Sequence, residues 1–182
     1  GIDNVGTVPA TLTAYLGIEA FKPDIVISAG TAGGFKEKGG EIGDVYHSTS
    51  TINHDRKIAI PVFTAYGMDS RPSHPCPNMV KALGLKGGVV STGNRFDKCE
   101  VDMETMAENS AAVKEMEAAA VSWVCSLSGT PCFALKALTD IVDGDRPSHD
   151  EFLENLATAA SHLKDAVVGA VEFMDGKSLK EL

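Results

Sequence analysis

Short apolar runs alternate along the chain with longer stretches in which apolar positions recur at helical spacing. Residues 6–21 show the helical spacing and place Pro9 in the first turn, where proline fits a helix. Residues 25–27 are β-branched and predict a buried parallel strand. We expect this strand to end in the glycine-rich segment 28–35, which either connects two strands as a tight turn or brings backbone amides close to a ligand.

The same pattern predicts the remaining elements. Strands are expected over residues 45–52, 87–93 and 132–138, and helices over residues 78–83, 100–107, 117–127 and 148–174. Residues 53–78 contain four prolines and predict a long irregular loop. The alternation predicts a single domain over residues 1–182, with a three-layer α/β/α fold and a mixed, largely parallel central sheet.

Composition narrows the function classes. Only 6% of the residues are aromatic while 43% are hydrophobic, so the core is expected to be mostly aliphatic. A net charge of −9 disfavours nucleic-acid partners, and the chain has no apolar run long enough to span a membrane. The four cysteines show no CxxC spacing, which indicates reduced thiols and a cytoplasmic protein. The five histidines show no metal-ligand spacing, so no metal is expected.

Polar residues stand where three predicted strands end: Thr31 after Gly30, Thr92 beside Gly93, and Asp140 after an apolar run. In α/β folds, ligands bind outside the carboxyl ends of parallel strands. These three positions therefore predict one binding site at a single edge of the sheet.

Two carboxylates are the strongest candidates for chemistry. Asp140 lies at a buried strand end near other acidic residues, and burial with like charge nearby raises a carboxyl pKa, as a proton donor requires. The alternative for Asp140 is a turn residue in a solvated loop. Glu117 lies at a strand-to-helix junction, where its carboxylate either accepts hydrogen bonds from two vicinal hydroxyls or favours the helix dipole.

Two further residues have both a binding and a packing interpretation, and His54 has a structural and a catalytic one. Met116 is either core filler or a flexible contact for a sugar. Phe96 either stacks on a flat base or anchors its loop by packing. His54 beside Asp55 indicates a hydrogen bond within the loop rather than a catalytic pair.

Taken together, these residues resemble the nucleoside phosphorylase/nucleosidase superfamily, and most of all its plant-type 5'-methylthioadenosine nucleosidases. The matching segments, in the family's order, are GIDNVGTVPA, PDIVISAGTAGGF, GDVYHS followed by HDR, STGNRFD, VKEMEAAAV and LKALTDIVDGDRPSHDEFLENL. The specificity comes from the conjunction, since each motif alone is weak.

The resemblance implies roles for the candidate residues. Asp140 corresponds to the acid that protonates N7 of adenine, and Glu117 to the carboxylate that holds the ribose hydroxyls. Phe96 corresponds to the base-stacking position, and the backbone of Asp97 to a contact with the adenine edge. Thr31 corresponds to a position near the ribose and the attacking water.

The segment from Lys114 through Glu115 and Met116 to Glu117 is expected to bind substrate, with Met116 packed on the ribose. The implied reaction is hydrolysis of the N-glycosidic bond of 5'-methylthioadenosine, and possible substrates extend to S-adenosylhomocysteine. The alternatives are a nucleoside phosphorylase of the same superfamily and a nucleoside-binding homologue without turnover. Ser28 stands where hexameric phosphorylases carry a phosphate-binding arginine, which favours water as the nucleophile.

The resemblance also implies a homodimer in which the loop over residues 53–78 contacts the partner, and it implies no cofactor. The chain opens without a methionine or signal peptide, and the family's N-terminal strands, with the glutamate that activates water, have no counterpart in it. We therefore expect very weak hydrolysis, or none, from the 182-residue polypeptide alone. Asn94 and Arg95 depart from the family pattern in the base pocket.

Overall fold

The structure is a computed structural model that describes residues 4–182. The strands are β1 (Val26–Gly34), β2 (Val45–Asn53), β3 (Arg71–Pro72), β4 (Lys86–Thr92), β5 (Ala111–Glu115) and β6 (Cys132–Ile141). The α-helices are α1 (Thr7–Phe21), α2 (Thr64–Met68), α3 (Pro77–Leu83), α4 (Glu100–Glu108), α5 (Ala118–Ser128) and α6 (Ser148–Met174). The part of the first family segment that falls on residues 1–3 lies outside the described residues.

The strands form one mixed sheet in the order β3-β2-β4-β5-β1-β6. The longest ladders are parallel and join β1 to β6 and β2 to β4, while β1 pairs with β5 in the antiparallel sense. The sheet also curls back on itself, because the first residues of β2 pair antiparallel with β6. The predicted mixed, largely parallel sheet is therefore confirmed, and its closure is a feature that the pattern did not reveal.

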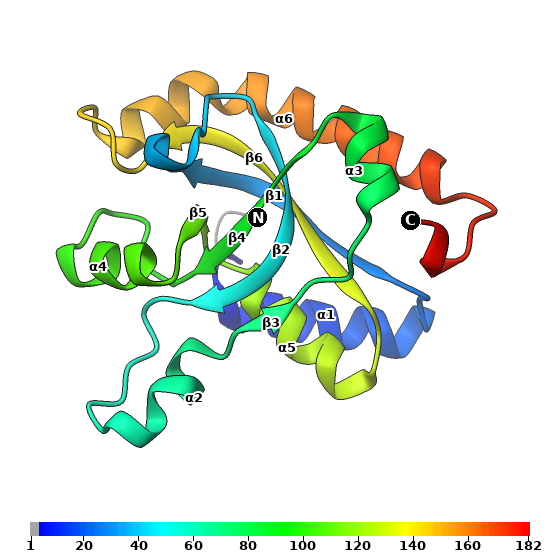
Figure 1. Ribbon diagram of the computed structural model, residues 1–182, viewed down its shortest axis with the longest axis horizontal. Helices are drawn as coiled ribbons and strands as arrows, with labels where there is room; N and C mark the ends of the chain where they lie inside the picture. The colour runs from blue at the N-terminus through cyan, green and yellow to red at the C-terminus, as the bar shows by residue number, and fades with distance from the viewer. Residues whose placement is uncertain (1–3) are drawn as a thin grey trace.

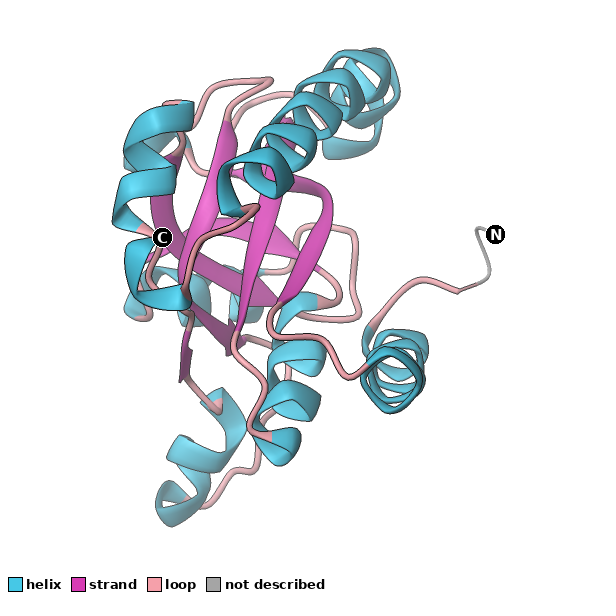
Figure 2. Cartoon of the chain, turned by 90° about the vertical axis from the view of Figure 1, so that its right-hand side faces the viewer, coloured by secondary structure: helices cyan, strands magenta, loops and turns pink. Residues whose placement is uncertain are grey.

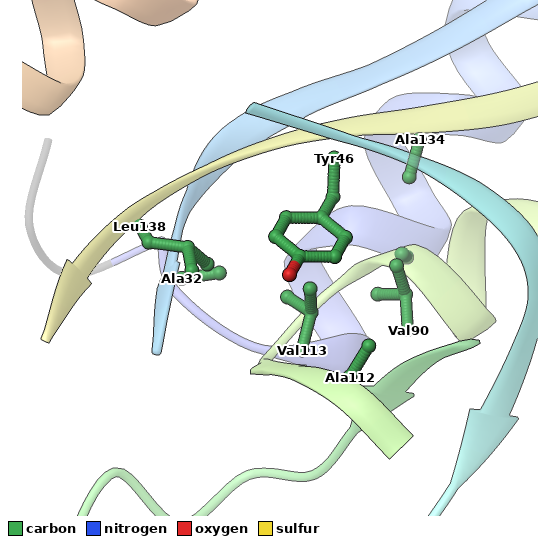
Figure 3. Packing of buried hydrophobic residues seen from close by; sticks show 8 residues of the cluster. Ala32, Tyr46, Val90, Ala112, Val113, Ala134 and Leu138 are labelled. Carbon is green, nitrogen blue, oxygen red and sulfur yellow. The ribbon is translucent and has the colours of Figure 1, made fainter. Parts of the chain in front are cut away.

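Closing the sheet encloses the main core. Figure 3 shows the Tyr46 ring of β2 among side chains that come from β1, β4, β5 and β6. The other members are small or aliphatic: Ala32, Val90, Ala112, Val113, Ala118, Ala134 and Leu138. The expected aliphatic core is thus confirmed, with one tyrosine at its centre.

Helices cover the sheet on both sides (Figures 1 and 2). The long helix α6 packs along β6 and β1, with α3 beside it. On the other side α5 packs against the sheet, and α1 packs on α5 through Ile18, Val124 and Cys125. The predicted α/β/α arrangement is confirmed. Within residues 4–182, no helix combines the length and the apolar composition needed to cross a bilayer.

The glycine-rich segment over residues 28–35 is largely strand, so of its two interpretations the tight turn is wrong. β1 continues to Gly34 and stays paired with β6 throughout. The glycines serve close packing instead of chain reversal: a Cβ at Gly33 would lie 2.9 Å from Asp140 Oδ2, and one at Gly34 would collide with Leu138.

The prediction of an irregular loop over residues 53–78 is wrong in part. β2 includes Asn53, and the region contains the 3₁₀ turn Pro61–Phe63, the short helix α2 and the two-residue strand β3. Helix α3 begins at Pro77, one residue before its predicted start, because proline is favoured in the first helical turn. These elements are too short for hydrophobic periodicity to indicate them.

Candidate functional site

A cavity of about 650 Å³ opens beside the carboxyl ends of β1 and β6 and the end of β5. Seven of the eight residues predicted for the site line it: Thr31, Phe96, Lys114, Glu115, Met116, Glu117 and Asp140. The eighth, Asp97, is not among its lining residues. Ser28 also lines the cavity, together with Lys136, His149 and Phe152, which the sequence did not single out.

The sheet register brings the candidates together. Thr31 and Asp140 lie on the parallel neighbours β1 and β6, and Lys114 on β5 pairs with Gly33 of β1. Thr92, at the end of β4, is fully buried and does not line the cavity. Its hydroxyl instead donates to Glu115. Two of the three predicted strand-end residues, Thr31 and Asp140, therefore line the cavity. The third, Thr92, contacts the lining residue Glu115.

Asp140 is held in the cavity wall as a buried carboxyl whose pKa is raised above its ordinary value. Its side chain is only 4% exposed, and the Thr139 hydroxyl donates to its Oδ1 over 2.9 Å. Burial raises the pKa of Asp140, and the nearby Glu151 adds to the effect; hydrogen bonds from Thr139 and Ser148 and the charge of Lys114 oppose it without reversing it. A carboxyl that keeps its proton to higher pH suits general-acid chemistry.

Glu115 is the opposite kind of carboxylate. It is also 4% exposed, but Lys136 Nζ lies 2.8 Å from its Oε2, and the amides of Glu117 and Ala118 donate to it over 3.0 Å and 2.9 Å. Burial alone would raise its pKa, but the Lys136 ammonium and the hydrogen bonds from Thr92 and the backbone lower it overall. Glu115 is therefore a fixed anion whose two oxygens are already engaged within the protein.

Glu117 precedes helix α5 as its N-cap residue, with no side-chain bond to the helix itself. Its Oε1 instead accepts the amide of Gly6 over 2.9 Å, which ties the start of α1 to the edge of the cavity. Met116 lies between this carboxylate and Glu115, half-buried and lining the cavity. The carboxylate of Glu117 is therefore directed across the site and not into the first turn of α5.

The loop between β4 and α4 supplies the aromatic wall. Phe96 is 40% exposed, and its ring meets Phe152 of α6 edge-on, with ring centroids 5.6 Å apart. Lys114 Nζ donates to the carbonyl oxygens of Phe96 and Asp97, over 2.5 Å and 3.0 Å. Burial lowers the pKa of Lys114, an effect that the charges of Asp140, Asp102 and Asp97 oppose.

His54 and Asp55 make separate bonds, in line with their predicted structural role. His54 Nδ1 lies 3.0 Å from Ser91 Oγ, and Asp55 accepts the amide of Asn94 over 2.6 Å. Burial lowers the pKa of His54.

Sequence reasoning missed Lys136, which is 2% exposed, lines the cavity and neutralises Glu115. A signal was present, because Lys136 is the single charged residue within the apolar run from Cys132 to Leu138. A buried charge requires a partner, so such a lysine indicates a carboxylate elsewhere in the chain.

Comparisons with known proteins agree with this geometry. The family described as the phosphorylase superfamily matches residues 1–172. A 5'-methylthioadenosine/S-adenosylhomocysteine nucleosidase of Arabidopsis thaliana is 46% identical over 182 residues, which are all of this chain and 72% of the relative.

Two solved structures share the fold. The Arabidopsis thaliana 5'-methylthioadenosine nucleosidase in apo form is 45% identical, with a TM-score of 0.95 over 98% of this chain and 73% of that one. A Colwellia psychrerythraea nucleosidase of the same name as the first relative, in complex with adenine, is 26% identical, with a TM-score of 0.78 over 96% and 77% of the two chains. The chain therefore belongs to the phosphorylase superfamily, in its 5'-methylthioadenosine/S-adenosylhomocysteine nucleosidase branch.

Proposed function

We propose that the protein hydrolyses the N-glycosidic bond of 5'-methylthioadenosine and releases adenine and 5-methylthioribose. The observation that carries the proposal is Asp140, a buried carboxyl with a raised pKa in the wall of a cavity that Phe96 and Glu117 also line. The names of its relatives support this substrate. The same chemistry applies to S-adenosylhomocysteine, which shares the adenosine part.

Asp140 acts on the leaving group. As the bond between C1' and N9 breaks, its electron pair moves into the purine, and the proton of Asp140 passes to N7, so that adenine leaves as a neutral molecule. Thr139, bonded to the same carboxyl, keeps it oriented. A general acid with a pKa raised toward the working pH is typically worth about 100-fold to 10,000-fold in rate.

The sugar develops positive charge as adenine leaves. In this proposal Glu117 accepts the two ribose hydroxyls, Met116 packs against the sugar, and Thr31 lies near C1', where the oxygen of water bonds. Glu115, paired with Lys136, accepts the amides of Glu117 and Ala118 and so holds the segment that carries Glu117 in place. The water gives up a proton as its oxygen bonds to C1', and in this proposal the solvent takes it up. Binding of the nucleoside and its turnover are therefore separate measurements.

Water is favoured over phosphate as the nucleophile because the cationic side chains that line the cavity are already paired within the protein. In the described part of the chain, the lysines and the arginine that line it are already engaged: Lys136 with Glu115, Arg95 with Asp102 over 3.0 Å, and Lys114 with two carbonyls. Ser28 lines the cavity without a charge. A phosphate dianion would require at least one released cation.

The test is adenine release from 5'-methylthioadenosine, with and without inorganic phosphate, alongside calorimetric titration of the same nucleoside and of adenine. Release that is independent of phosphate, with free 5-methylthioribose as product, supports the proposal. Phosphate-dependent release with a sugar phosphate as product selects a phosphorylase instead. Binding without release identifies a nucleoside-binding protein, and absence of both rejects the proposed site.

We further propose a homodimer. Large apolar side chains on α1 and in the region between β2 and α2 are exposed, with Val8 and Val62 each 79% and Phe21 82% accessible. The second of these surfaces lies within residues 53–78, the segment expected to contact a partner copy. Sedimentation equilibrium of the purified protein tests this: a mass of one chain at micromolar concentration rejects the dimer.

The remaining proposals concern domain organisation, the metabolic pathway and the location in the cell. We propose that residues 1–182 act as one domain, and that the reaction belongs to methionine salvage, because it removes the thioether product of methionine-derived cofactors. A cytoplasmic location is supported by four cysteines that are all free thiols in the structure. Localising the tagged full-length protein by microscopy tests the last point.

A further inference from the structure

The loop that presents Phe96 depends on side chains for its shape. Residues 93–99 belong to neither a helix nor a strand; they connect β4 to α4, and two of them, Arg95 and Phe96, line the cavity. Arg95, which also lines the cavity, pairs with Asp102 over 3.0 Å, but its own side chain is 52% exposed, so solvent screens this end of the ion pair. The start of the loop is tied at Asn94, whose amide donates to Asp55 over 2.6 Å, and Phe96 and Asp97 further along need a contact of their own.

Lys114 supplies that contact. Its ammonium lies at the end of β5, is only 8% exposed, and donates to two successive carbonyls, those of Phe96 and Asp97. Successive carbonyls of an extended strand point to opposite sides, so a cation that holds both fixes a turned conformation of the backbone. Hydrogen bonds from a charged donor are about twice as strong as neutral ones.

We propose that Lys114 is a positioning residue that fixes, through these two carbonyls, the aromatic ring and the peptide edge that contact the purine. The inference rests on the proposed function, since it takes as base contacts Phe96, which lines the cavity, and the backbone of Asp97, which follows it in the chain and is not itself a lining residue. The peptide between Phe96 and Asp97 is planar and trans, so directing its carbonyl at Lys114 directs the Asp97 N–H the opposite way. Binding a cation to the carbonyl also polarises that peptide and strengthens the N–H as a donor.

A fixed N–H donor discriminates between purines. Adenine presents an acceptor at N1, whereas hypoxanthine presents an N–H there and would meet the donor with a donor. Lys114 is therefore expected to influence the preference for adenine without touching the base itself. A merely structural lysine would change the folded fraction and leave this preference intact.

The experiment is calorimetric titration of the purified chain with adenine and with hypoxanthine, for the wild type and for Lys114→Met, Lys114→Gln and Lys114→Arg. Methionine removes donor and charge, glutamine keeps a donor without charge, and arginine keeps both. We expect Lys114→Met to weaken adenine binding about ten-fold or more and to reduce the preference over hypoxanthine. Arginine should restore most of both, and glutamine part.

A pH series gives a second readout. The charge of Lys114 lowers the pKa of Asp140, so its removal should move the loss of adenine binding to higher pH in Lys114→Met and Lys114→Gln, but not in Lys114→Arg. Lys86→Met is the matched control, because Lys86 also donates to a backbone carbonyl, that of Gly39 over 2.8 Å, at the opposite end of the sheet. Its adenine affinity should equal that of the wild type.

The possible outcomes distinguish a failure of the role proposed for Lys114 from a failure of the proposed function. If the wild type binds adenine and Lys114→Met binds it equally well with the same preference, the inference is overturned while the proposed function stands. Equal weakening toward both purines, with no pH shift, also overturns it. If the wild type binds no adenine, the proposed function fails first. Should Lys114→Met not fold, as judged by circular dichroism, Lys114→Gln decides by the same criteria.

Discussion

Glu115 and Asp140 lie in the wall of one cavity and are equally buried, at 4% exposure each, yet their pKa values are shifted in opposite directions. The difference lies in the partners. Glu115 faces the ammonium of Lys136 and several hydrogen-bond donors, whereas Asp140 has two hydroxyl donors and an acidic neighbour, Glu151. Burial alone therefore does not decide whether a carboxyl serves as an acid or as a fixed anion.

The two groups also contribute to stability with opposite signs. The folded pKa of Glu115 lies below its ordinary value of 4.5, so its contribution is present above that pH and is lost as pH falls through the folded pKa. The folded pKa of Asp140 lies above its ordinary value of 3.8, so Asp140 destabilises the fold increasingly as pH rises from there through the folded pKa. The molecule thus tolerates a destabilising carboxyl at the position where the proposed proton donor is needed.

Replacing Asp140 by asparagine should produce the largest effect. Asparagine keeps the shape but has no acidic proton, so adenine release should fall by about 100-fold to 10,000-fold in a spectrophotometric assay, while nucleoside binding changes less. Asp145→Asn, in the exposed turn after β6, is the matched control and should retain full activity. Retention of more than half the rate by Asp140→Asn would remove it from the proton-donor role.

Replacing Lys136 should affect the other buried carboxylate, Glu115, and through it the stability of the fold. Lys136→Met leaves the Glu115 charge buried without its cation, so the free energy of unfolding in urea should fall by about 3–5 kcal/mol. The double variant Glu115→Gln, Lys136→Met removes both charges and should recover most of the loss. A single variant as stable as the wild type would show that the ion pair does not hold Glu115 in place.

Replacing Thr92, which also bonds to Glu115, should lower the stability of the fold by a smaller amount. Its hydroxyl donates to Glu115 and accepts the amide of Ala119 over 2.9 Å, and all these groups are buried. Thr92→Val should therefore lower the free energy of unfolding by about 1–3 kcal/mol. Thr105→Val, which loses only a bond from an exposed helix face to Val101, should change it by less than about 0.5 kcal/mol. Equal losses in the two variants would contradict the role given to Thr92.

Replacing Thr139 tests how the pKa of Asp140 is set, and we expect it to produce the smallest change of the four. The hydrogen bond from Thr139 stabilises charged Asp140 and lowers its pKa, so Thr139→Val should raise that pKa further. Activity that needs protonated Asp140 should then persist to higher pH, which a pH–rate profile of adenine release measures. Thr92→Val should leave the midpoint unchanged. A midpoint that moves to lower pH would reverse the assignment.

Most elements of the fold follow from local pattern. Helix α6 spans Ser148–Met174 as its spacing predicts, and the buried strands around β4 and β6 were recognisable as apolar runs. The glycine segment over residues 28–35 shows what local patterns cannot predict. Gly33 and Gly34 resemble turn residues, but the space they leave is filled by side chains of β6, more than one hundred positions later in the chain.

By itself the sequence determined the α/β class, the aliphatic core and the residue types gathered at the strand ends, since periodicity and composition are local properties. Tertiary structure alone decided that β2 closes the sheet against β6, that Lys136 neutralises Glu115, and that Lys114 reaches the loop of Phe96. These are pairings between distant segments. Whether a buried carboxyl keeps or loses its proton depends on which group such a pairing brings within about 3 Å, and spacing along the chain does not contain that information.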